Sequence, residues 1–143
     1  MRQSFYTEIE ESFPSDRGRV ALEVADRSVG RSTWSFAEIA SEAARAASLL
    51  ADLGLQKGDR VAVQVEKSPE ALMLYLGCLR GGYVFLPMNT AYREDEVDYL
   101  VGNAEPALIV FSSFLFSARE FPKIGKAFTF WPLCQKDFVI FIN

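Results

Sequence analysis

The sequence predicts an α/β protein built on a parallel β–α–β–α–β unit that is preceded by an N-terminal β-hairpin. Within residues 60–111 of the 143-residue chain, three short apolar segments alternate with two helical ones. The expected strands are Arg60–Val65, Tyr83–Leu86 and Ala107–Phe111, and the expected helices are Pro69–Arg80 and Arg93–Gly102. This order implies two right-handed crossovers and a sheet covered by helices on both faces.

The N-terminal residues predict a short helix followed by the hairpin. An amphipathic helix is expected over residues 1–13, because apolar side chains recur there at a spacing of four. These positions are Phe5, Ile9 and Phe13. After the polar break at Pro14–Gly18, two short strand-like segments flank the turn residues 26–28. These segments are Val20–Ala25 and Val29–Trp34.

A longer helix is predicted to begin directly after Ser35. Ser35 and Glu38 form the capping-box pattern, in which each side chain satisfies a backbone N–H of the first turn. An apolar face then follows at helical spacing, and its alanines allow another element to approach closely. The residues of this face are Phe36, Ile39, Ala43, Ala47, Leu50 and Leu53. Gly54 stands where a glycine ends a helix.

The two helices of the parallel unit carry their own signals. Ser68 and Pro69 are typical of the cap and first position of a helix, and the segment that follows is apolar nearly all round, which predicts burial. Gly81 and Gly82 are expected to end it. The helix expected over Arg93–Gly102 has Val97, Leu100 and Val101 on one side.

The character of the chain changes after Ser113. Eight of the twelve phenylalanines fall within residues 111–143, and the periodicity becomes irregular. Two strand-like segments remain, Phe128–Trp131 and Phe138–Ile142. We therefore expect residues 1–111 to form one part of a domain and residues 112–143 to be an aromatic-rich tail foreign to that fold.

Composition excludes several classes of protein. Lys and Arg number 15 against 19 Asp and Glu, so the net charge of −4 argues against a nucleic-acid partner. The chain has no histidine and only two cysteines, which excludes His-based catalysis and a disulfide framework. The segment Ala71–Met88 is interpreted as a helix, a turn and a strand rather than a membrane span. Without a secretory signal, a cytoplasmic location is expected.

Two stretches resemble the adenylate-forming synthetase superfamily, which comprises acyl-CoA synthetases, luciferases and the adenylation domains of peptide synthetases. Trp34–Ile39 matches the early motif of that family, and Leu79–Asn89 matches its second core motif. Gly58–Ala62 between them is also similar. The resemblance runs from about Ser35 to Phe111 and implies a truncated N-terminal portion of an adenylate-forming fold.

Within the superfamily, the chain most resembles malonyl-CoA synthetases. The resemblance lies in Arg60–Pro69 and Leu86–Tyr92. Enzymes of this kind convert malonate, ATP and CoA into malonyl-CoA, AMP and pyrophosphate through a malonyl-adenylate. For the full-length family the resemblance therefore implies ATP, Mg²⁺ and CoA as cofactors and a small carboxylic acid as substrate.

The catalytic motifs of the family are missing from this sequence. The phosphate loop, the aromatic-Thr-Glu motif, the Thr-Gly-Asp motif and the C-terminal domain with its lysine are all absent, and Pro122–Lys126 matches the lysine segment only by coincidence. Gly81 and Gly82 close a helix, whereas a phosphate loop opens one. We therefore assign no catalytic, cofactor-binding or metal residue to this chain and expect it to be inactive alone. The alternative is a non-catalytic α/β module that acts by binding a partner, whose identity the sequence leaves unknown.

The remaining polar and sulfur-containing residues have structural interpretations. The acidic cluster Glu94, Asp95, Glu96 and Asp98 is interpreted as surface charge near a helix start rather than as a metal site. Cys78 is interpreted as a small core residue, and Cys134 lies in the tail. Asn89, Thr90, Tyr92 and Arg93 follow a parallel strand where open α/β sheets bind ligands, but capping of a turn by Asn89 and Thr90 is the favoured explanation.

Overall fold

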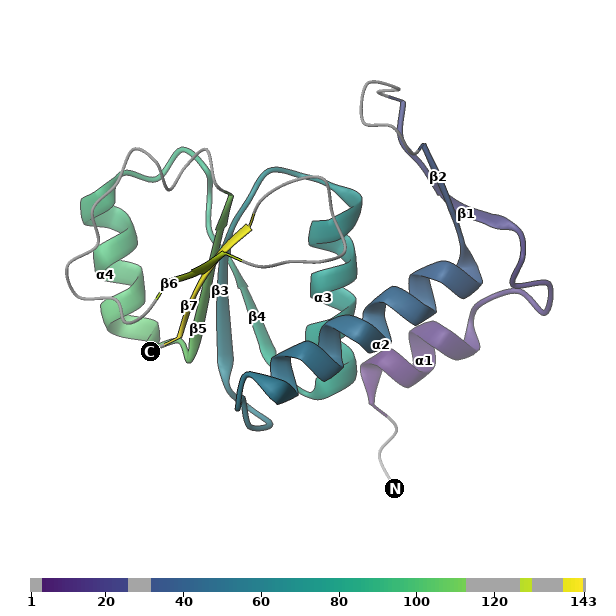
Figure 1. The fold of residues 1–143 in the computed structure, drawn as a ribbon, viewed down its shortest axis with the longest axis horizontal. Coiled ribbons are helices and arrows are strands. Elements are labelled where there is room, and N and C mark those ends of the chain that lie inside the picture. The colour runs from purple at the N-terminus through teal and green to yellow at the C-terminus, as the bar shows by residue number, and fades with distance from the viewer. Residues whose placement is uncertain (1–3, 26–31, 113–126, 130–137, 143) are drawn as a thin grey trace.

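A computed structural model describes residues 4–25, 32–112, 127–129 and 138–142 of the chain. Figure 1 shows a central sheet with helices on both sides and a separate N-terminal hairpin. The helices are α1 (Phe5–Glu11), α2 (Phe36–Asp52), α3 (Pro69–Gly81) and α4 (Glu94–Ala104). The strands are β1 (Val20–Glu23), β2 (Thr33–Ser35), β3 (Arg60–Gln64), β4 (Val84–Pro87), β5 (Leu108–Ser112), β6 (Ala127–Thr129) and β7 (Phe138–Ile142).

The parallel β–α–β–α–β unit predicted from the sequence is confirmed. The sheet order is β4-β3-β5-β7-β6, and β3 pairs in parallel with both β4 and β5. Side chains of successive strand residues point to opposite faces of a sheet. Val61 and Val63 accordingly pack with α2 and α3, whereas Ala62 packs with α4 on the other face. The result is a three-layer arrangement (Figure 1).

The strand β4 is less buried than its apolar sequence predicts, although helices lie on both faces of the sheet (Figure 1). β4 lies at the outer edge of the sheet, so Val84 remains 48% exposed and Pro87 is exposed as well. An edge strand is also where proline is tolerated within a sheet, because one side of the backbone has no partner strand. Apolar sequence alone did not distinguish this edge strand from the buried strand β3.

The two strand-like segments of the C-terminal tail are also strands in the structure. β7 pairs antiparallel with β5, in a register that sets Val110 opposite Ile140, and β6 pairs antiparallel with β7. The strand β6 includes Phe128 and Thr129 of the first predicted segment, whose residues 130 and 131 lie outside the described residues. The proposed boundary at residue 111, with a foreign tail beyond it, stays a prediction.

The hairpin of β1 and β2 is confirmed, and its expected turn at residues 26–28 lies outside the described residues. The face predicted for the first helix is partly wrong. Phe5 is 60% exposed, whereas Tyr6 is buried and packs with Ile9 and Phe13. The buried face therefore follows the spacing of positions 6, 9 and 13, which is as typical of a helix as a spacing of four.

A polar network holds α1 against α3. Nη1 of Arg80 donates to the hydroxyl of Tyr6 at 3.3 Å and lies 3.5 Å from a carboxylate oxygen of Glu10. The guanidinium of Arg80 also lies over the Tyr6 ring, 5.2 Å from its centroid. A second arginine, Arg17, contacts the other oxygen of Glu10 at 3.4 Å. Because the arginines are partly exposed, each ion pair contributes below about 1 kcal/mol.

The capping box at the start of α2 is confirmed. The backbone N–H of Glu38 donates to Oγ of Ser35 at 3.2 Å, and the backbone N–H of Ser35 donates to the Glu38 carboxylate at 2.8 Å. The helix ends as expected, with Gly54 at a φ of 92°. On the buried face, however, Ala46 is fully buried and Ala47 only partly.

The helices α2 and α3 pack at very short range. A Cβ atom placed on Gly77 of α3 would lie 2.5 Å from Cβ of Ala46, 3.1 Å from the backbone N of Ala47 and 3.2 Å from the carbonyl O of Ala43. The expectation that the alanines allow a close approach is thus confirmed. In contrast, α3 is not buried all round, since Leu72 is 37% exposed.

Candidate functional site

The carboxyl ends of the parallel strands are the place where an open α/β sheet binds ligands. Here the loop after β4 is attached to the end of β3 by the side chain of Gln64, which is fully buried. Nε2 of Gln64 donates to the carbonyl of Asn89 at 2.7 Å and to that of Tyr92 at 3.4 Å. The buried amide therefore fixes the course of the loop.

Sequence reasoning missed Gln64. The available signal was a single polar residue within the otherwise apolar run after Arg60. For Asn89, the turn-capping interpretation is confirmed, because its Oδ1 accepts the backbone N–H of Ala91 at 2.9 Å. The structure therefore brings Asn89 and Tyr92 together with Gln64 through backbone carbonyls, while Arg93 is exposed.

A shallow depression of about 330 Å³ lies on α4, beside this loop. It is lined by Tyr92, Asp95, Glu96, Tyr99 and Leu100. The depression is open to solvent, and Tyr99 on its wall is 69% exposed. A binding site generally encloses most of a ligand with a few convergent polar groups, and this depression lacks that enclosure.

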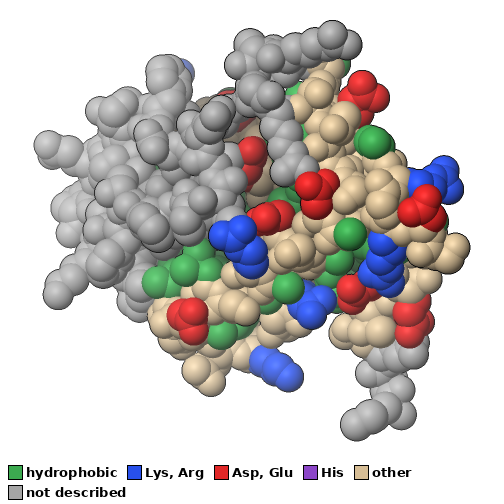
Figure 2. Space-filling model, turned by 45° about the vertical axis from the view of Figure 1, so that its right-hand side comes forward, with side chains coloured by type: hydrophobic (Ala, Val, Ile, Leu, Met, Phe, Trp, Pro, Cys, Tyr) green, Lys and Arg blue, Asp and Glu red, His purple; other side chains and the backbone are tan. Residues whose placement is uncertain are grey.

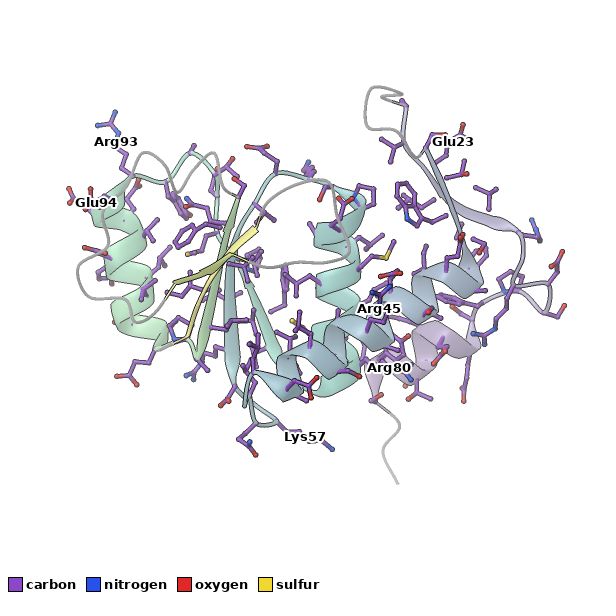
Figure 3. All side chains as sticks on the ribbon, in the orientation of Figure 1. Glu23, Arg45, Lys57, Arg80, Arg93 and Glu94 are labelled. Atoms are coloured by element: carbon purple, nitrogen blue, oxygen red, sulfur yellow. The ribbon has the colours of Figure 1, made fainter. Side chains whose placement is uncertain are left out.

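The acidic residues at the start of α4 are exposed, in agreement with their interpretation as surface charge. A carboxylate oxygen of Glu96 accepts the backbone N–H of Arg93 at 2.8 Å, so this acid caps its own helix. Figure 3 shows Arg93 and Glu94 at this end of α4, directed away from the sheet. Across the described part of the chain, no group of three Asp, Glu, Cys or His side chains is arranged to hold a metal ion.

The two glycines at the end of α3, Gly81 and Gly82, have the structural role expected of them. Gly82 adopts a φ of 80°, and the backbone N–H of Tyr83 returns to the carbonyl of Cys78 at 2.8 Å. A Cβ atom on Gly81 would collide with the ring of Tyr83. These glycines thus end a helix and fit a side chain closely, which leaves no array of free N–H groups for a phosphate.

Cys78 is a fully buried core residue, as interpreted from the sequence. Burial raises the pKa of its thiol from 9.0 to about 12. Because the thiolate is the reactive form, the folded chain holds this cysteine in an unreactive state. Cys134 and Lys126 lie outside the described residues.

We expect the Cys78 thiol to react with a thiol reagent at pH 8 only after the chain unfolds in urea. The reaction is measured in the Cys134→Ser variant, in which Cys78 is the one remaining cysteine.

The raised pKa of Cys78 also makes the free energy of unfolding depend on pH. Its contribution to stability is complete below about pH 9, where the thiol is protonated in both the folded and the unfolded chain. Above that pH the unfolded thiol ionises first, so stability is lost by about 1.4 kcal/mol per pH unit as the pH rises toward 12. Cys78→Ala should lack this pH-dependent loss in urea titrations, and equal losses would contradict the assignment.

The surface in view in Figure 2 mixes acidic and basic side chains with small apolar patches, and neither charge dominates its coloured part. This distribution gives no footprint for a polyanion on that part of the surface. Among the described residues, no helix is long and apolar enough to span a membrane.

Comparison with known proteins places these observations in a family. The model of the family described as "AMP-binding enzyme" matches residues 9–129. The uncharacterized acyl–CoA ligase YtcI of Bacillus subtilis is 32% identical over 120 residues, which cover 83% of this chain and 23% of that protein. Human mitochondrial acyl-coenzyme A synthetase ACSM2B is 35% identical over 78 residues, or 54% of this chain and 14% of that protein.

Solved structures of related proteins support the same family. ATP-bound MatB from Rhodopseudomonas palustris is 41% identical with a TM-score of 0.69, over 76% of this chain and 21% of that one. An acyl-CoA synthetase from Brucella canis is 27% identical with a TM-score of 0.66, over 72% of this chain and 19% of that one. The fold is therefore that of the N-terminal part of an adenylate-forming α/β synthetase. This chain belongs to the AMP-binding enzyme family, with a resemblance to malonyl-CoA synthetases, and it spans less than a quarter of these relatives.

Proposed function

We propose that residues 1–111 are the N-terminal part of an AMP-forming acyl-CoA synthetase that activates malonate or a similar small carboxylic acid. The observation that carries the proposal is the 41% identity to MatB, together with the shared fold. The parent reaction would consume ATP and CoA and release AMP and pyrophosphate. A cytoplasmic location of the parent enzyme belongs to the same proposal.

Within that enzyme, this part supplies structure rather than chemistry. The early motif caps α2 through Ser35, and the second motif ends α3 at Gly82 and leads into β4. The described residues do not fit ATP with Mg²⁺, because the glycines close a helix and the acids of α4 are spread over an exposed surface. We therefore propose that the chain alone forms no adenylate.

The first test is ATP–pyrophosphate exchange with malonate, using the purified 143-residue chain and intact MatB as a positive control. We expect exchange from MatB and none above the blank from this chain. Exchange by the chain would overturn the proposal that it is inactive, while leaving its family membership untouched.

The second test replaces the matching N-terminal segment of MatB by residues 1–111 of this chain and measures malonyl-CoA formation. We expect a folded and active hybrid. A matched hybrid that also carries residues 112–143 is expected to be inactive, because the tail would interrupt the fold. If the first hybrid folds and makes no malonyl-CoA, the alternative of a non-catalytic binding module is favoured.

A further inference from the structure

The two outer edges of the parallel unit differ in their capacity to accept another strand. On β4, the N–H groups of Val84 and Met88 donate toward β3, to the carbonyls of Asp59 and Val63, each at 2.8 Å. Successive backbone nitrogens of a strand point in alternate directions, so those of Phe85 and Pro87 point away from β3, toward the outer edge. Since proline has no N–H, this edge offers a single backbone donor and is poorly suited to strand addition.

The outer edge of β5 contains no proline, so it lacks no backbone donor. The N–H of Ala107 donates to the carbonyl of Arg60 on the β3 side at 2.9 Å, so by alternation the N–H groups of Ile109 and Phe111 also face β3. Those of Leu108 and Val110 then face the opposite way. Both outward-facing positions, Leu108 and Val110, have a backbone donor, and every residue from Leu108 to Phe111 is apolar, so this edge is a template for another strand.

The strand β7 occupies that template in this chain. Its register places Ile142 opposite Leu108 and Ile140 opposite Val110. The pairing is antiparallel, whereas a further β–α–β crossover would have added a parallel strand. β7 therefore closes the edge of the parallel unit instead of continuing the parallel series that precedes it.

We propose that the outer edge of β5 is a strand-accepting interface and that β7 is its built-in cap. When β7 is displaced, the edge pairs with the same edge of a second copy of this chain. A second copy fits because the apolar and uncharged segment Leu108–Phe111 is self-complementary and has no proline or charge to oppose edge-to-edge pairing. This inference depends only on the sheet and is independent of the acid that the parent enzyme activates.

The test compares two proline variants of β7 in the full chain. With Ile140 opposite Val110 in a hydrogen-bonded pair, its N–H points to β5, and the N–H of the preceding Val139 points to β6. Ile140→Pro therefore removes a bond to β5, whereas Val139→Pro makes the same chemical change on the β6 side. Residue-resolved hydrogen exchange and the mass in solution are then measured for both variants.

We expect Ile140→Pro to speed exchange of the Leu108 and Val110 amides at least tenfold at micromolar dilution and to produce dimers at higher concentration. Val139→Pro should leave both amides protected and the chain monomeric. The Ile109 and Phe111 amides, which face β3, report in each variant that the parallel unit remains folded.

Two outcomes would overturn the proposal. Unchanged exchange of Leu108 and Val110 in Ile140→Pro would show that β7 does not cap the edge. An opened edge on a chain that stays monomeric at every concentration would show that the edge does not accept a second copy. Neither result bears on the pyrophosphate-exchange test, so failure of this proposal is distinguishable from failure of the proposed function.

Discussion

Replacing Gln64 by glutamate is expected to lower the free energy of unfolding at pH 7 by about 3–5 kcal/mol, because it buries a charge and removes a buried hydrogen-bond donor. The Gln64 side chain is fully buried and its Nε2 donates to the carbonyls of Asn89 and Tyr92. A carboxylate there would face two acceptors with no proton to offer. Urea titration followed by circular dichroism measures the loss.

The pH dependence of Gln64→Glu provides a second readout. Burial would raise the pKa of the introduced carboxyl above that of the unfolded chain, near 4.3. The destabilisation should therefore be greatest at pH 7 and shrink as the pH falls toward 5, where the carboxyl regains a proton to donate. Gln56→Glu makes the same change at an exposed side chain, whose Nε2 donates to the carbonyl of Gly54 at 3.2 Å, and should lower stability by at most about 1 kcal/mol. Equal effects at both positions would refute the buried role of Gln64.

Replacing Gly77 by valine is expected to destabilise the chain by about 3 kcal/mol, near the upper end of overpacking effects. The new Cβ would press on Cβ of Ala46 and on backbone atoms of Ala43 and Ala47, and the backbone atoms cannot rotate aside. The helices α2 and α3 would have to separate, which opens the cluster around Ala46 and Leu74. The midpoint of urea unfolding measures the change.

Gly102→Val is the matched control for Gly77→Val. Gly102 also lies within a helix, and a Cβ atom there would meet nothing within 4 Å. Because valine favours a helix more than glycine does, this variant should be neutral or slightly more stable, by up to about 0.5 kcal/mol. Equal losses of stability in the two valine variants would contradict the assignment of the loss at Gly77 to the close approach of α2 and α3.

The features that the sequence predicts correctly are those determined by neighbouring residues. The capping box needs only Ser35 and Glu38, and the end of α3 needs only Gly82. The alternation of strands and helices between residues 60 and 111 is likewise visible in neighbouring residues. It predicts the parallel unit because a crossover between parallel strands is almost always right-handed. Local periodicity and glycine conformation decide such features before any tertiary contact forms.

The features that the sequence does not predict depend on distant partners. Burial of Tyr6 rather than Phe5 depends on Arg80, which lies 74 residues further along the chain. The exposure of Val84 depends on the order of strands in the sheet, which no local pattern encodes. For the candidate site, the polar residue in the run after Arg60 was visible, but its carbonyl partners on the loop after β4 were not.

The attachment of α1 has a consequence for the order of events during synthesis. Its polar partner on α3 is Arg80, so the contacts of Arg80 with Tyr6 and Glu10 join residues 74 and 70 positions apart. Ribosomes add about 5–20 residues per second, so α1 waits on the order of 4–14 seconds after its own synthesis for α3 to be made. During that interval α1, at 7 residues, is too short to be stable alone. The polar contacts of the first helix with α3 therefore form only after more than half of the chain has been made.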